Sequence, residues 1–140
     1  MTFPKAICSA TIGAFALIAL MPATAHAADK PFTKIDKVTF SSKDTISVDV
    51  TYMRAPPEEG QERTVDADVR QRSKEAGGVT AKSATCDNKE KKITLTVKSA
   101  SNSFEKGGKV EVNTGIYTSV DGEPFTNPDR GTASKGEYKT

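Results

Sequence analysis

Apolar and polar residues alternate with a period of two along most of the chain, and this pattern limits the possible folds more than any other feature. Successive side chains of a β-strand point to opposite faces of a sheet, so the alternation predicts strands with one buried face. The clearest run spans residues 46–52, and no segment repeats apolar residues at the i, i+3, i+4, i+7 spacing over a helical length. Further runs occupy residues 38–40, 65–70, 79–86, 93–97, 110–120 and 131–138.

Turn-forming residues, such as Pro56-Pro57 and Gly107-Gly108, separate these runs. Glycine supplies a positive φ and proline presets φ, so both favour tight turns. About seven short strands joined by such turns are typical of an antiparallel sandwich. We therefore predict an all-β fold, an immunoglobulin-like antiparallel β-sandwich, with a β-barrel of similar size as the nearest alternative. Within it we expect the strand of Ile93, Leu95 and Val97 to be central, and residues 72–76 to form a loop.

The first 27 residues have the pattern of a secretory signal peptide. Lys5 is the only charged residue before Asp29, an apolar run follows it, and Ala25-His26-Ala27 has small residues at the cleavage positions. A transmembrane anchor needs about 20 apolar residues, and this run is shorter. We predict cleavage between Ala27 and Ala28, a single domain at 28–140 and no membrane span after processing. The protein is then extracellular, or periplasmic if its source has an outer membrane.

Processing would also remove residues on which catalysis commonly depends. His26 is the only histidine of the chain, and Cys8 is one of its two cysteines. Nucleophilic triads need an imidazole to move the proton, and zinc sites draw on histidine and cysteine. We therefore expect no enzymatic activity, no metal and no cofactor. A net charge of +2, with acids and bases interspersed, gives no general attraction to nucleic acid.

Cys86 is the one cysteine that would remain, so no intramolecular disulfide can form. We expect a monomer in which Cys86 is a small buried apolar residue. A disulfide-linked dimer and a reactive thiol are the alternatives, because a leftover cysteine in an exported protein can signal either.

The longest irregular stretch, residues 119–131, is the first candidate for binding. Loops of this length often carry function, and its two prolines would reduce the entropy lost on binding. The candidate residues are Asp121, Glu123, Phe125, Asn127, Asp129 and Arg130. The expected partner is a protein or a component of the cell envelope, and the alternative is a secreted enzyme inhibitor that presents the 121–131 loop. The loop at 55–63 is the next candidate, and the two loops need not lie at the same end.

Asp66 and Asp68 are predicted to share the outward face of one strand, followed by Arg70. Paired carboxylates can share a proton or bind calcium, but calcium usually takes about 6–8 oxygen ligands from converging loops. We therefore interpret this face as a solvated surface of mixed charge.

One stretch resembles a family of small secreted immunoglobulin-like proteins of actinobacteria, mostly of unknown function. It runs from 84 to 112 and includes Ala84-Thr85-Cys86-Asp87-Asn88 and the Gly107-Gly108 turn, and the run 48–52 resembles the family's first long strand. In that family a cysteine often follows the tyrosine and pairs with the cysteine of the Cys-Asp turn. Here Met53 follows Tyr52, so the resemblance implies that Cys86 is the remaining, buried half of a lost disulfide. It carries no catalytic residue.

Overall fold

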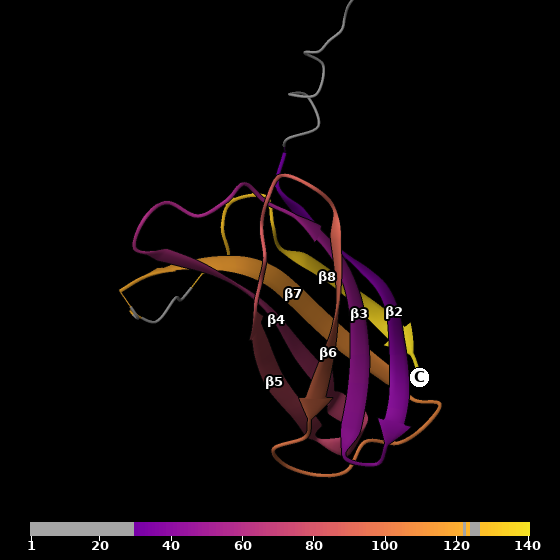
Figure 1. Ribbon diagram of the computed structural model, residues 1–140. Helices are drawn as coiled ribbons and strands as arrows, with labels where there is room; N and C mark the ends of the chain where they lie inside the picture. The colour runs from indigo at the N-terminus through magenta and orange to yellow at the C-terminus, as the bar shows by residue number, and fades with distance from the viewer. Residues whose placement is uncertain (1–29, 122, 124–126) are drawn as a thin grey trace, which may run out of the picture. The chain divides into compact units, whose positions relative to one another are not determined.

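The computed structural model describes residues 30–121, 123 and 127–140. The predicted signal peptide, its cleavage site at Ala27 and Ala28, and Phe125 lie outside these residues. The unit Pro31–Thr140 consists of two antiparallel sheets packed face to face (Figure 1). This confirms the predicted immunoglobulin-like β-sandwich.

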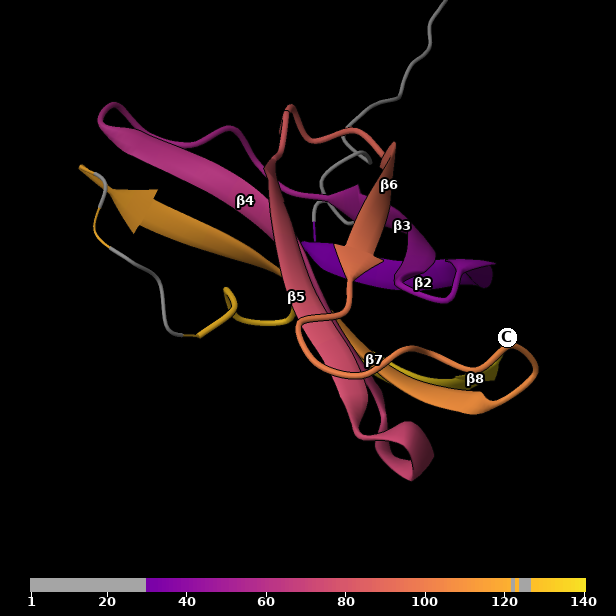
Figure 2. The ribbon, with the colours of Figure 1, turned by 90° about the horizontal axis from the view of Figure 1, so that it is seen from below.

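One sheet has three strands and the other has four. The first has the order β2-β3-β6, formed by β2 (Phe32–Ser42), β3 (Thr45–Met53) and β6 (Lys91–Lys98). The second has the order β5-β4-β7-β8, formed by β5 (Ala76–Ser83), β4 (Gln61–Gln71), β7 (Lys109–Val120) and β8 (Ser134–Lys139). Figure 2 shows β2 and β3 on one side, with β7 and β8 on the other. The order differs from the constant-type immunoglobulin arrangement in one respect, because the fourth strand, β5, pairs with the opposite sheet.

The core lies between the two sheets and follows the period-two pattern of the sequence. Alternate residues of β3 and β4 point inward, and Ile46, Val48 and Val65 have no exposed surface. Burial of each such side chain stabilises the fold by about 1.5–3 kcal/mol. The other buried apolar residues include Val50, Tyr52, Ala67, Val69, Leu95, Val97, Phe104, Val110, Val112 and Ile116.

The structure corrects the expected position of Leu95. β6 is an edge strand, and β3 is the central strand of its sheet. Leu95 and Val97 are nevertheless fully buried, because the four-stranded sheet covers the inner face of β6. Alternation in a sequence reports which face of a strand is buried, whereas strand order depends on pairings between distant segments.

The structure refines two other segments. Residues Arg72–Lys74 form one turn of 3-10 helix rather than a plain loop, and Glu75 ends it with a φ of 51°. Ser134–Lys139 forms a strand at the edge of the four-stranded sheet, within the run expected at 131–138.

β5 differs from the other strands because its apolar residue points outward. Val79 is 63 % exposed, whereas the edge of β5 at Gly78 lies against the other sheet. A Cβ atom at Gly78 would be 2.1 Å from the carbonyl oxygen of Lys98, so this close approach requires glycine. Within the part of the chain that the structure describes, no helix is long and apolar enough to cross a membrane.

Candidate functional site

Three connections meet at one end of the sandwich, which we call the loop end: residues 54–60, 84–90 and 121–133. Because consecutive strands run antiparallel, every second connection emerges at the same end (Figure 1). The backbone N–H of Asp121 donates to the carbonyl of Gly60 over 3.3 Å. The N–H of Asn88 donates to the carbonyl of Arg54 over 3.0 Å. The two loops singled out from the sequence therefore lie side by side.

A buried arginine holds these connections together. Arg63, near the start of β4, has a side chain that is only 6 % exposed. Its Nε donates to the carbonyl of Ala55 over 2.9 Å, and its Nη2 donates to the carbonyl of Pro56 over 3.2 Å. Its Nη1 donates to the hydroxyl of Thr118 on β7. The guanidinium of Arg63, on β4, thus links the β3–β4 loop to β7.

Asp129 extends this network to the β7–β8 connection. Its Oδ2 accepts a hydrogen bond from the Thr118 hydroxyl over 2.6 Å. The same oxygen lies 3.5 Å from Nη1 of Arg63 and 3.3 Å from Nε of Arg54. Burial and the neighbouring Arg54 lower the pKa of Arg63, and Asp129 opposes this effect. A guanidinium remains charged despite such effects, so Asp129 compensates a cation that the fold has largely removed from water.

Arg63 is a functional residue that the sequence interpretation missed. It precedes Val65, Ala67 and Val69 in the same alternating phase, and that phase is the buried one. An arginine in a buried phase requires acceptors, and its position in the alternation was the signal that could have identified it.

The residues predicted to bind differ in their exposure to solvent. Asp121, Glu123, Asn127 and Arg130 are exposed, and Phe125 lies outside the described residues. The carboxylate of Asp129 is 17 % exposed and is engaged by two arginines and Thr118. We therefore assign Asp129 a positioning role, in which it anchors the base of the 121–131 loop.

Cys86 is buried beneath the loop end. It is 8 % exposed, and burial raises the pKa of its thiol. The thiolate is the reactive form of cysteine, so this environment disfavours reactivity. The bond from Asn88 to Arg54 holds the Cys86-Asp87 turn near the end of β3, where Met53 is the last residue of the strand.

The loop end offers groups that can form ion pairs and hydrogen bonds. Its described surface presents exposed charges and amides on loops that the Arg63 network holds in place. Among residues 30–121, 123 and 127–140, no three His, Cys, Asp or Glu side chains are grouped so that they could hold a metal ion.

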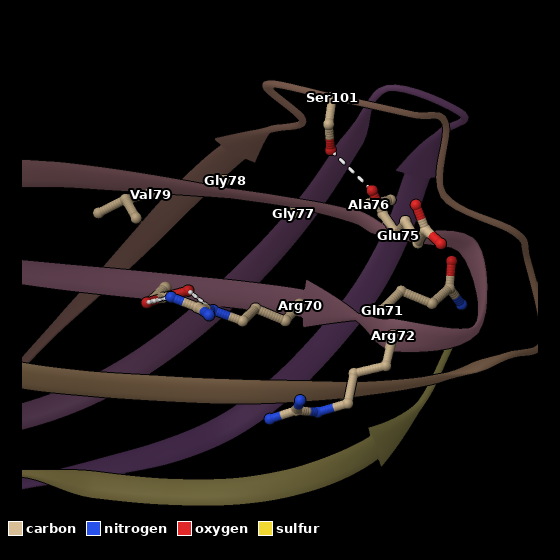
Figure 3. A pocket seen from close by; sticks show the side chains of 10 residues that line it. Arg70, Gln71, Arg72, Glu75, Ala76, Gly77, Gly78, Val79 and Ser101 are labelled. Carbon is tan, nitrogen blue, oxygen red and sulfur yellow. Dashed lines mark hydrogen bonds and ion pairs between the residues drawn. The ribbon is translucent and has the colours of Figure 1, made fainter.

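A second surface, the outer face of the four-stranded sheet, is hollowed in two places that share Asp68. The larger hollow, of about 550 Å³, is shallow and extends from Arg70 and Arg72 past Gly77 to Val79 (Figure 3). As predicted, Asp66 and Asp68 point to this outer face, where they line the smaller hollow.

Comparison with known proteins assigns no family to the chain. No protein-family model matches the sequence, and no curated protein matches it either.

Proposed function

We propose that the protein is a secreted, non-catalytic β-sandwich module that binds a protein or cell-envelope partner through its loop end. The observation that carries this proposal is the Arg63 network. Ordering flexible loops on binding costs about 1 kcal/mol for each residue immobilised, and loops that are already held avoid part of that cost. A buried charge that only connects loops is expensive, so we infer that it is kept because loop position matters.

The location follows from the N-terminal sequence rather than from the fold. The positively charged start, the apolar run and the Ala25-His26-Ala27 site support export. After export the chain would carry no histidine, and this supports a binding role over a catalytic one.

One observation also favours an enzyme inhibitor as a second function. An inhibitory loop must keep one conformation while a protease binds it. Asp129, at the C-terminal base of the 121–131 loop, is held by Arg54, Arg63 and Thr118. The anchoring of this base supports the inhibitor proposal.

The test is capture of a partner from spent medium and from isolated envelope by the processed protein, immobilised through its C-terminus. Thr140 bonds to Gly108, which lies at the opposite end of the sandwich, so this attachment leaves the loops free. One variant reverses two exposed charges of the loop end, Glu58→Lys with Glu59→Lys. The matched control reverses two exposed charges at the opposite end, Asp44→Lys with Glu105→Lys.

We expect the wild-type protein and the control to retain the same partner and the loop variant to lose most of it. Enrichment on envelope supports the module, and recovery of one stoichiometric protease supports the inhibitor. Equal retention by all three proteins would exclude the loop end as the binding surface. If the wild-type protein specifically retains no partner from either fraction, both proposed functions are contradicted.

A further inference from the structure

The smaller hollow on the outer face of the four-stranded sheet has the features of a binding site, and we call it the acidic hollow. It has a volume of about 360 Å³, near the lower limit of the about 300–1,000 Å³ typical of small-ligand pockets. Three strands, β4, β7 and β8, and the β7–β8 connection contribute to it. Its polar and apolar lining includes Asp66, Asp68, Asn113, Tyr117, Pro128 and Lys135.

Strand register brings these side chains together from distant parts of the sequence. Asp68 is opposite Asn113, and Asn113 is in turn opposite Lys135, so one row crosses three strands. Asp66 is opposite Gly115, the position in β7 between Asn113 and Tyr117. Residues paired across antiparallel strands share a face, so all of these side chains point away from the core.

Gly115 explains why this part of the sheet is hollowed rather than flat. A Cβ atom at this position would lie 2.9 Å from Cβ of Pro128, so the absence of a side chain lets the β7–β8 connection cross the sheet closely. The connection is fixed there, because the N–H of Asp129 donates to the carbonyl of Ile116 over 2.7 Å. Pro128 thus forms a rigid apolar wall beside Asp66.

The two carboxylates of the acidic hollow differ in how they are compensated. Asp68 accepts two hydrogen bonds from Arg70, each of 3.2 Å. Figure 3 shows the side chain of Arg70 lying along the sheet. At Asp66, burial raises the pKa of the carboxyl by more than the backbone of Gly115 and of Asp66 itself lowers it. Within the described part of the chain, no cationic side chain forms an ion pair with Asp66. Among the described residues, Asp66 therefore has no ion-pair partner beside Pro128, although Lys135 lines the same hollow.

Burial raises the pKa of the Asp66 carboxyl to about 6, and the charge of Asp68 adds to the rise. The charges of Asp66 and Asp68 also raise the pKa of Tyr117, although its burial has the larger effect. In both shifts burial makes the larger contribution and the negative charges of the hollow make the smaller one.

The shape and charge of the hollow select among ligands. A metal ion would need more oxygen ligands than the Asp66 carboxylate supplies, since calcium takes about 6–8. A neutral ligand would leave the charge of Asp66 unpaired. A monovalent organic cation would pair with Asp66, could be hydrogen-bonded by Asn113, and would place its apolar stem against Pro128.

We propose that the acidic hollow binds a single ammonium or guanidinium group, with Asp66 as its counter-ion and Pro128 and Tyr117 as its walls. The ligand chemistry is that of a lysine or arginine side chain on a protein partner, or of a free amine of the same kind. The site shares Pro128 with the loop end, but its charged groups lie on β4 and β8, so it does not depend on the proposed function.

The test is a titration of the ¹⁵N-labelled processed protein at pH 7.5 and low salt, followed by NMR. The probes are Nα-acetyl-arginine amide, Nα-acetyl-lysine amide and the neutral isostere Nα-acetyl-citrulline amide. A capped Gly-Gly-Arg-Gly-Gly peptide separates a peptide source from a free amine, and calcium chloride tests the metal alternative. The variants are Asp66→Asn and, as a matched control on the other sheet, Asp49→Asn.

We expect saturable shifts of the Asp66, Asn113 and Tyr117 amides with the arginine and lysine probes, and none with citrulline. Affinity should fall at least about tenfold in Asp66→Asn and stay within about twofold of wild type in Asp49→Asn, because a charge-assisted pair is lost only in the first. Tighter binding of the peptide than of the amide would identify a protein side chain as the source, and equal binding a free amine. Equal responses to citrulline, unchanged affinity in Asp66→Asn, or a calcium response at the same amides would overturn the proposal.

Discussion

Replacement of Asp66 by asparagine is expected to stabilise the protein at neutral pH. The change removes from the acidic hollow a half-buried charge that forms no ion pair within the described part of the chain, and it nearly preserves the shape of the side chain. Burial, with a smaller effect of Asp68, raises the pKa of the Asp66 carboxyl from 3.8 to about 6. Between these two values the folded state binds more protons than the unfolded state, so stability falls as the pH rises through this window. Asparagine does not titrate and escapes this loss.

The structure also sets the size of the effect. At about 1.36 kcal/mol for each pH unit, the difference between 3.8 and about 6 corresponds to at most about 3 kcal/mol. Asp66 keeps partial contact with solvent, which screens the charge, so we expect about 1–2 kcal/mol. The groups that face it are Asp68 on its own strand, Tyr117 on β7 and Lys135 on β8, whereas β5 presents the uncharged Ala81.

The measurement is urea denaturation of wild type, Asp66→Asn and Asp49→Asn at intervals from pH 3.5 to 7.5. The free energy of unfolding of Asp66→Asn should exceed that of wild type increasingly as the pH rises. A change of stability with pH that Asp49→Asn also shows is due to the loss of any carboxylate. Only the additional change in Asp66→Asn is attributed to the environment of Asp66. A difference that stays constant with pH, or that favours wild type at pH 7.5, would refute the electrostatic reasoning.

Four further predictions concern the core, the loop end and processing. Arg63→Ala should lower the free energy of unfolding by about 3 kcal/mol in urea denaturation, because two loop carbonyls lose their donor and Asp129 loses one of its two cationic partners; a loss below about 0.5 kcal/mol would mean that the network does not hold the loops. Leu95→Ala should cost about 2–5 kcal/mol in the same assay, since Leu95 is fully buried although β6 is an edge strand. Cys86 should react with a thiol reagent much more slowly in the folded protein than in urea, because burial raises its pKa, and equal rates would contradict its placement in the core. N-terminal sequencing of the exported protein should begin at Ala28, and a protein that begins at Met1 would exclude cleavage.

The acidic hollow and the loop end both use the connection between β7 and β8. Asp129 and Pro128 are neighbours, yet Asp129 is anchored by Arg63 while Pro128 forms the wall beside Asp66. A residue such as Asp66 that lowers stability at neutral pH is often kept for binding rather than for folding. If Asp66 is kept for binding, Asp66→Asn should gain stability and lose affinity for the cationic probes.

For most strands the sequence by itself determined which face is buried. β5 is an exception, because its Val79 points outward. Ile46, Val48 and Val50 alternate with polar residues, and only a strand places alternate side chains in the core and in water. The burial of these residues therefore followed from their spacing in the sequence. The outward position of Asp66 and Asp68 followed in the same way.

Only the tertiary structure decided which strands are neighbours and which side chains meet. Strand order placed β6 at an edge, and register placed Lys135 in the same row as Asp68. The Arg63 network and the acidic hollow both depend on contacts across more than forty residues of sequence, such as the 66 positions between Arg63 and Asp129. Such contacts arise from pairing and packing of whole sheets, and no local pattern of residues specifies them.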